Sequence, residues 1–93
     1  MDILVAYDVR TDTREGRRRL RHVAQICLNY GQRVQHSVFE CRVDEKSYIL
    51  LQKAIQQVAK PTEDSVRIYR INTVGRWVWG LDHYVDFDDP LIY

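Results

Sequence analysis

A run of five apolar residues near the start of the chain constrains its fold most strongly. Residues 3–7 read ILVAY, and the polar turn sequence Thr11-Asp12-Thr13 follows shortly after them. A continuous apolar run of this length, bounded by a turn, is typical of a strand that is covered on both faces. We therefore expect a strand over residues 2–8, buried on both faces or nearly so and ending at Asp8.

The next segment has the periodicity of a helix. Within residues 14–30, four apolar residues recur at the spacing i, i+3, i+4, i+7 and predict one buried stripe: Leu20, Val23, Ala24 and Cys27. Thr13 or Asp12 is suited to cap the helix N-terminus, and Gly31 to cap its C-terminus.

The remaining segments complete a β-α-β-α-β order. Residues 33–43 predict a second strand, Asp44 caps a second helix that runs to about Ala59, and residues 65–71 predict a third strand. Residues 76–80 are a candidate fourth strand. This order with short connections predicts an α+β sandwich of the ferredoxin-like type, in which two helices pack on one face of an antiparallel sheet.

The composition predicts a single soluble domain over residues 1–93. Hydrophobic residues make up 45% of the chain and charged residues 29%, which is ordinary for a globular domain and excludes disorder. No apolar stretch approaches the roughly 18 residues of a membrane span, and Met1-Asp2 does not open a signal peptide. We therefore expect a cytoplasmic protein with no membrane partner.

The small size of the chain favours association with a second copy. A chain of this length buries only about two-thirds of the surface that its unfolded form exposes. The sheet face without helices leaves Tyr69, Trp77 and Trp79 without cover, and a second subunit is the expected place for them.

The two cysteines, Cys27 and Cys41, lie within apolar patterns and predict a pair of reduced core thiols. Neither belongs to a CxxC motif, and the three histidines show no ligand spacing. The sequence therefore gives no indication of a disulfide scaffold or a zinc site.

The charge of the chain is unevenly distributed along it. The formal net charge is only +1, but residues 1–42 carry eight arginines against five acids, a balance of +3, and residues 43–93 carry −2. Four of these arginines predict one stripe on the first helix: Arg14, Arg17, Arg18 and Arg21. Glu15 is the only acid within that helix, which favours a phosphate-binding surface over a solvated face paired with acids.

Asp8 is the candidate for a metal ligand, because a carboxylate at a strand end is held rigidly beside an open loop. The alternative is a turn residue that accepts hydrogen bonds from nearby backbone N–H groups. One carboxylate alone is a poor Mg²⁺ site, and a two-fold axis near Asp8 would supply the second.

Three short segments, taken together and in this order, resemble the CRISPR-associated Cas2 family. They are Tyr7-Asp8 at the strand end, residues 30–35 (YGQRVQ) and residues 37–41 (SVFEC). The resemblance covers essentially the whole chain, and residues 89–93 (DPLIY) resemble the branch that accompanies type I-C systems. Members of the family are small partners of the spacer integrase in bacterial adaptive immunity.

The resemblance implies a ferredoxin-like fold and a two-fold homodimer. A C-terminal strand of one subunit, here residues 76–93, is expected to dock on the sheet of the other. Asp8 matches the metal-binding aspartate of the family, and the dimer is expected to face two Asp8 carboxylates across its axis.

The same resemblance implies roles for other positions of the cleft. The catalytic positions that accompany Asp8 are Tyr7, Ser37 and Phe39. Arg33 joins the arginine stripe as a nucleic-acid-binding position. The polar insert at residues 11–16 leaves open whether Arg17, Arg18 or Arg19 takes the family's helix position.

Two functions are compatible with these features. In the first, the dimer takes part in spacer acquisition with the integrase and is also an endonuclease, using Mg²⁺ (or Mn²⁺ in its place) to cut phosphodiester bonds in RNA or DNA. In the second, the dimer is a non-catalytic bridge that holds DNA through its backbone within the integrase complex. The arginine stripe serves both functions, whereas Asp8 is needed only for the first.

Overall fold

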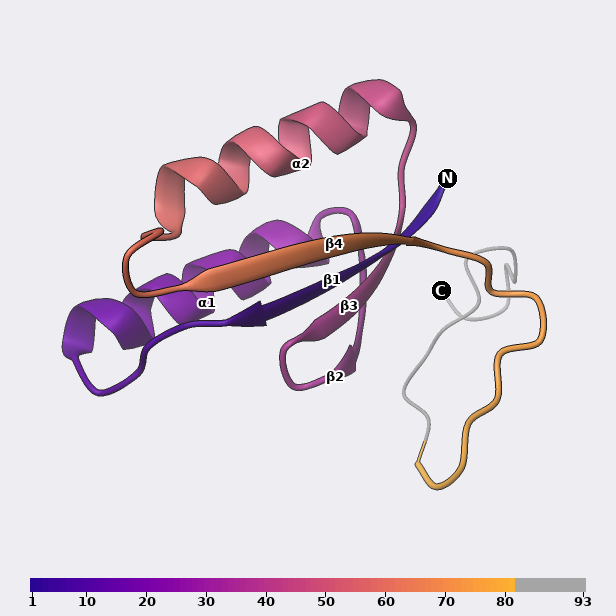
Figure 1. Ribbon diagram of the computed structural model, residues 1–93, viewed down its shortest axis with the longest axis horizontal. Helices are drawn as coiled ribbons and strands as arrows, with labels where there is room; N and C mark the ends of the chain where they lie inside the picture. Colours follow the sequence, from indigo (N-terminus) through magenta and orange to yellow (C-terminus); the bar gives the residue numbers. More distant parts are fainter. Residues whose placement is uncertain (82–93) are drawn as a thin grey trace.

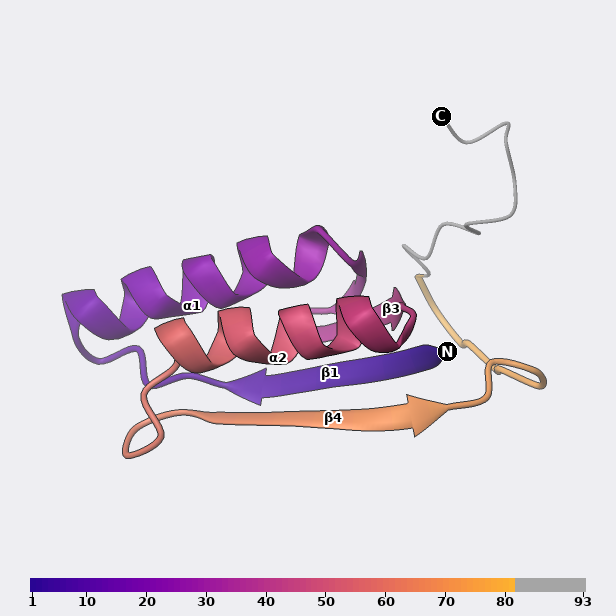
Figure 2. The same ribbon diagram turned by 90° about the horizontal axis from the view of Figure 1, so that it is seen from above.

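Four antiparallel strands and two helices form two layers in a computed structural model, which describes residues 1–81. The elements are β1 (Asp2–Asp8), α1 (Arg14–Leu28), β2 (Gly31–Gln35), β3 (Val38–Arg42), α2 (Glu45–Val58) and β4 (Ser65–Ile71). The sheet order is β2-β3-β1-β4, and both helices lie over the same face (Figure 1, Figure 2). The predicted ferredoxin-like α+β fold is confirmed.

The strand β1 lies inside the sheet and supplies the centre of the core. It pairs with β3 on one side and β4 on the other, so that Val5 lies opposite both Phe39 and Ile68. Ile3, Val5 and Tyr7 are buried beneath the helices, whereas Leu4 and Ala6 on the other face are only half-buried. The predicted strand bounds are confirmed, but cover on both faces is wrong for this chain because both helices pack on one side.

Both helices begin at side-chain caps that the sequence indicated. The hydroxyl oxygen of Thr13 accepts a hydrogen bond from the backbone N–H of Gly16 at 3.0 Å, and a carboxylate oxygen of Asp44 accepts one from that of Ser47 at 2.7 Å. The inner faces bury Val23 and Cys27 of α1, and Leu51 of α2, against the sheet.

The segment predicted as one strand, residues 33–43, is instead a hairpin of β2 and β3. His36 and Ser37 form the turn between the two strands. The pairing register shifts between Arg33 and Gln35, so the hairpin is irregular. The sequence contains no Gly or Pro at this turn, and for that reason the prediction missed it.

The predicted C-terminal cap of α1 is also corrected. The helix ends at Leu28 and is capped by Asn29, and Gly31 is already the first residue of β2. A Cβ atom at position 31 would clash with the carbonyl oxygen of Glu40 on the neighbouring strand. Gly31 is therefore explained by a close approach of two strands and not by a left-handed helix end.

The candidate fourth strand, residues 76–80, is not a strand within the described chain. After β4 the chain extends away from the sheet (Figure 1). A strand requires a neighbour to accept and donate its backbone hydrogen bonds, and residues 72–81 have no such strand beside them within the described residues. The predicted tail beyond residue 81, with its DPLIY ending, lies outside the residues that the structure describes.

The two cysteines are buried free thiols, as predicted. Burial raises the pKa of Cys27 to about 11 and that of Cys41 to about 12. Both thiols therefore stay protonated at neutral pH and serve the core as small apolar groups. Within residues 1–81, neither helix has the length and apolarity that crossing a membrane requires.

Candidate nucleic-acid interface

Asp8 is the exposed last residue of β1, where it lies opposite Ser65 of β4. Successive residues of a strand face opposite sides of the sheet. Because Tyr7 is buried on the helix side, Asp8 belongs to the face that no helix covers. The carboxylate is thus rigidly placed by the sheet and accessible from outside.

The described residues of a single chain do not form a complete binding site for a divalent metal. Carboxylate oxygens are the ligands that Mg²⁺ prefers. Within residues 1–81, however, no group of three or more His, Cys, Asp or Glu side chains is arranged to hold an ion. Asp8 can therefore contribute only one protein ligand, and a second molecule would have to supply another.

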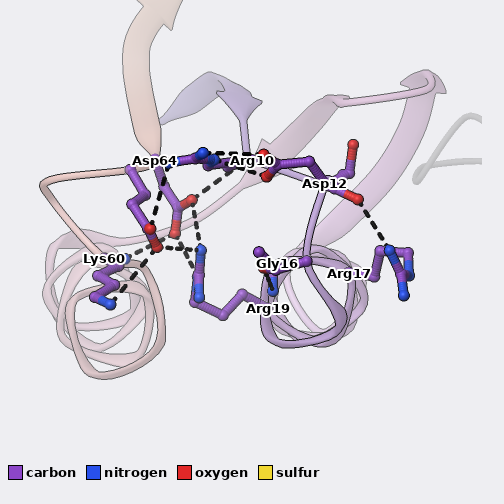
Figure 3. Close-up of polar contacts among 10 residues, drawn as sticks. Arg10, Asp12, Gly16, Arg17, Arg19, Lys60 and Asp64 are labelled. Atoms are coloured by element: carbon purple, nitrogen blue, oxygen red, sulfur yellow. Dashed lines mark hydrogen bonds and ion pairs between the residues drawn. The ribbon is translucent and has the colours of Figure 1, made fainter.

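The loop that follows Asp8 is tied down by a network of charged side chains (Figure 3). Arg10 Nε donates to Asp12 Oδ1 at 2.7 Å, and the backbone N–H of Arg10 donates to Asp64 Oδ1 at 3.2 Å. Arg19 of α1 donates from Nε to Asp64 Oδ2 at 2.8 Å and from Nη2 to Glu63 Oε2 at 3.0 Å. The network joins the β1–α1 loop, α1 and the turn before β4.

The Asp64 carboxylate is the centre of this network. Its side chain has 0% exposure, and burial alone would raise its pKa. Hydrogen bonds from Arg19 and from the backbone N–H groups of Lys60 and Arg10 outweigh burial, so the pKa of Asp64 lies below its ordinary value of 3.8. Asp64 therefore remains a carboxylate and holds the loop in place.

The arginine stripe of α1 is exposed, as the helical spacing predicted. Arg14, Arg18 and Arg21 form no ion pair with any residue among 1–81, and the guanidinium of Arg17 donates only to the backbone oxygen of Thr11, at 3.2 Å. Positive charges in the first turns oppose the helix dipole, so helix stability does not explain them. Four exposed guanidinium groups instead suit the phosphates of a nucleic acid.

Arg19 differs from its neighbours on the same helix. Its side chain is only 15% exposed, and its guanidinium is engaged by Asp64 and Glu63. The sequence left open which of Arg17, Arg18 and Arg19 takes the family's helix position. Arg17 and Arg18 are available to a ligand, whereas Arg19 is structural. Sequence reasoning missed the acidic partners, because no local pattern connects residues 19 and 64.

The other residues implied by the family resemblance gather on the helix side of the sheet. The rings of Tyr7 and Phe39 stack with centroids 6.1 Å apart, and Arg33 Cζ lies 5.2 Å from the centroid of Phe39. Ser37 accepts the backbone hydrogen bond of Tyr7 at its carbonyl oxygen, at 3.0 Å. Phe39 is fully buried, so its side chain packs in the core. These four residues come together, but Asp8 lies on the opposite face of β1 from Tyr7.

Comparison with known proteins assigns the family. A family model described as CRISPR associated protein Cas2 matches residues 1–76. The chain is 44% identical over 95 residues to a protein of Moorella thermoacetica named CRISPR-associated endoribonuclease Cas2 1, with 99% of each chain covered. It is 41% identical over 98 residues to a protein of Halalkalibacterium halodurans named CRISPR-associated endonuclease Cas2, with 100% of each covered.

Solved structures agree with this assignment. The crystal structure of Streptococcus pyogenes Cas2 at pH 6.5 superposes with a TM-score of 0.79 at 42% identity, covering 86% of this chain and 100% of that one. A hypothetical protein from Thermus thermophilus gives a TM-score of 0.75 at 33% identity, covering 87% and 92%. The fold is thus of the ferredoxin-like class that these proteins share. The chain belongs to the CRISPR-associated Cas2 family.

Proposed function

We propose that this chain is a nucleic-acid-binding protein of CRISPR adaptation that acts with the integrase in acquiring new spacers and is also a metal-dependent endonuclease. The observation that carries the proposal is the stripe of exposed arginines on α1, which form no ion pairs with residues 1–81. The names endoribonuclease and endonuclease given to relatives at 44% and 41% identity support a nuclease that acts on RNA or DNA. We also propose a cytoplasmic location, where RNA and DNA would be available to it.

The arginine stripe and Asp8 have separate tasks in this proposal. Arg14, Arg17, Arg18 and Arg21 bind backbone phosphates, which gives affinity without reading sequence. Asp8 stands at the rigid end of β1 on the uncovered face and is the residue that acts at the scissile phosphodiester. Arg33 and Ser37 lie on the other face of the sheet and do not share the Asp8 surface.

Asp8 is also the residue proposed to hold the metal. Mg²⁺, or Mn²⁺ in its place, would polarise the scissile phosphate and lower the pKa of a bound water. One chain offers too few ligands within residues 1–81, so the site requires a homodimer in which Asp8 of the partner subunit completes it.

The exposed apolar residues after β4 support a dimer. Trp77 is 79% exposed, Trp79 84% and Leu81 89%. A soluble protein rarely leaves such residues to water, and the proposed docking of residues 76–93 on a second subunit would cover them. Within residues 1–81, β4 is an edge strand with no neighbour on its outer side, along which such a segment could pair.

The alternative function is a purely structural bridge that holds DNA inside the integrase complex. One observation favours it: the arginine stripe is complete in the chain as described, whereas the metal site is not. A bridge needs only the stripe and the dimer, and would leave Asp8 without a chemical task.

The substitution Asp8→Asn separates the two functions. We expect it to reduce Mg²⁺-dependent cleavage of labelled single-stranded RNA and duplex DNA at least about 100-fold, because the metal loses its charged ligand. Binding of the same nucleic acids, measured by fluorescence anisotropy, should change less than about twofold because Asp8 is not part of the arginine stripe.

The matched control is Glu45→Gln, which removes an exposed carboxylate at the start of α2, beside the opposite end of β1 from Asp8. It should cleave as the wild type does. Cleavage that survives Asp8→Asn would contradict the assigned catalytic residue. A wild-type protein that binds duplex DNA but leaves both substrates intact would establish the bridge instead.

A further inference from the structure

The segment that follows β4 is held to the rest of the chain by an ion pair across the sheet. Arg76 Nη1 donates to Glu40 Oε2 at 3.4 Å. The Glu40 side chain is only 12% exposed and that of Arg76 34%, so water and salt screen the pair only in part. The strand β4 ends at Ile71, and Glu40 belongs to β3. The pair therefore joins two segments that are not neighbours in the sheet.

The position of Glu40 shows in which direction this segment is drawn. Phe39 is buried beneath the helices, so its neighbour Glu40 projects from the open face of the sheet, which neither helix covers. Glu40 lies opposite Leu4 of β1, and Leu4 lies opposite Tyr69 of β4. Because neighbouring strands are about 4.8 Å apart, Glu40 lies two strands, or roughly 10 Å, from β4. The ion pair thus draws Arg76 across the open face and away from the outer edge of β4.

A turn between β4 and Arg76 favours the same direction. The backbone N–H of Arg76 donates to the carbonyl oxygen of Thr73 at 3.2 Å, so residues 73–76 form the turn. Gly75, in its third position, has a φ of 82°, whereas Val74, in its second position, has no positive φ. The two-residue turns that fold a strand back as a hairpin require a positive φ at the second position. This turn is of another kind, and the chain after β4 turns away from the helices (Figure 1).

The apolar residues beyond Arg76 are strongly exposed in this arrangement. Trp77, Trp79 and Leu81 alternate with other residues, and a period of two places them on one face of an extended segment. Exposed apolar side chains in such a row are suited to an interface. The segment starts from the open face, and a second copy of this chain on that face is the surface that it can reach.

We propose that the ion pair between Glu40 and Arg76 is a latch that directs the segment after β4 to a second copy instead of to the chain's own β4. The inference rests on the homodimer of the proposed function and adds the contact that selects exchange between subunits. Because the pair forms within one chain, it orders the segment before two copies meet and reduces the entropy lost on docking. Without the latch, the segment is free to pair with its own β4 and would occupy the edge that the partner's segment needs.

Sedimentation equilibrium of the full chain measures the effect of the latch. Glu40→Gln and Arg76→Gln should each raise the dimer dissociation constant about three- to tenfold, because each removes a partly shielded charged hydrogen bond. The double variant should be no weaker than either single variant, because both substitutions remove the same contact. The matched control is Asp2→Asn, which breaks the ion pair of Asp2 with Arg42 and should change the constant less than about twofold. An equal effect of Asp2→Asn would overturn the latch.

Tryptophan fluorescence reports where the segment docks. Trp77 and Trp79 are the only tryptophans of the sequence, so the emission comes from this segment alone. Dilution of the wild type below its dimer dissociation constant should shift the emission to longer wavelength, because both rings are exposed in the single chain. An emission that does not shift in the diluted monomer would show that the segment docks on its own chain and would overturn the proposal.

The latch and the proposed function can fail separately. If Glu40→Gln and Arg76→Gln dimerise like the wild type while Asp8→Asn abolishes cleavage, the latch is overturned and the nuclease stands. If the two substitutions weaken the dimer without adding to each other, but the wild type neither binds nor cuts RNA or DNA, the latch stands and the proposed function is overturned.

Discussion

Gly16 controls how the loop after Asp8 meets the first helix. It is buried in the first turns of α1, and a Cβ atom at this position would clash with the carbonyl oxygen of Arg10. The backbone of the loop therefore approaches the helix more closely than any other residue would allow. The path of the β1–α1 loop at Arg10 therefore requires a glycine at position 16.

Gly16→Ala should lower the free energy of unfolding by about 1–3 kcal/mol, the range seen when a packed site is overfilled. In an open helix the same change would stabilise the protein by roughly 0.5–1 kcal/mol. Chemical denaturation measures the difference. Gln57→Ala on the exposed side of α2 is the control and should change stability by less than about 0.5 kcal/mol. A stabilised Gly16→Ala protein would contradict the close approach.

The helix α1 carries two kinds of arginine, one paired with acidic residues and the other exposed. Arg19 is held by Asp64 and Glu63 in the network that joins the loop, the helix and the turn before β4. The stripe of Arg14, Arg17, Arg18 and Arg21 is exposed on the same helix. One helix thus supplies both the structural charges that fix the loop and the charges available to a ligand.

The double substitution Arg14→Gln with Arg18→Gln tests the stripe. Each phosphate contact contributes about 0.9 to the slope of log K against log salt for duplex DNA, so two lost contacts should lower that slope by about 1–2. The loss should be similar for unrelated sequences, because backbone contacts carry no sequence information. Lys46→Gln with Lys53→Gln removes the same charge from α2, and an equal effect there would contradict a role specific to α1.

Asp64→Asn tests the network through its dependence on pH. The folded-state pKa of Asp64 lies below 3.8, so the stability that its charge contributes is present above that pH and is lost as the pH falls through the lower folded-state value. The substitution should lower the free energy of unfolding at pH 7 by roughly 1–3 kcal/mol. It should also flatten the loss of stability below pH 3.8. An acid-unfolding curve as steep as that of the wild type would contradict this role.

In the molecule as a whole, the two helices cover one face of the sheet, and the other face is uncovered within residues 1–81. The two helices close the core over one side of the sheet, as Figure 2 shows. The other side carries half-buried Leu4 and Ala6 together with exposed Tyr69 and Asp8. A second copy on this side would cover the apolar residues and bring another carboxylate to the proposed metal site.

Trp77→Ser with Trp79→Ser tests this association. The two side chains are 79% and 84% exposed in the single chain, and their loss should convert a dimer to a monomer in sedimentation or light-scattering measurements. Ile49→Ser with Leu50→Ser, which removes two half-exposed apolar residues from α2, should leave the dimer intact. A wild-type protein that is monomeric at high concentration would contradict the dimer and with it the two-carboxylate site.

Local patterns in the sequence were sufficient to predict the elements and the chemistry of their surfaces. Apolar runs and apolar periodicity located β1, both helices and β4, and the Thr13 and Asp44 caps indicated where the helices begin, because these signals act within a few neighbouring residues. The stripe of arginines followed from the same local spacing. The sequence analysis did not predict the hairpin at His36 and Ser37, because its turn is set by pairing with β1 and not by turn-forming residues.

Which of these residues share a surface depends on how the elements pack in three dimensions. Tyr7 and Asp8 are neighbours in sequence, yet the pleat of β1 sends them to opposite faces, one into a cavity with Arg33 and the other to the open side of the sheet. Arg19 resembles the neighbouring arginines of α1 in sequence until the fold brings Asp64 beside it, 45 residues further along the chain. Contacts between distant segments depend on how the layers pack, and no local pattern records them.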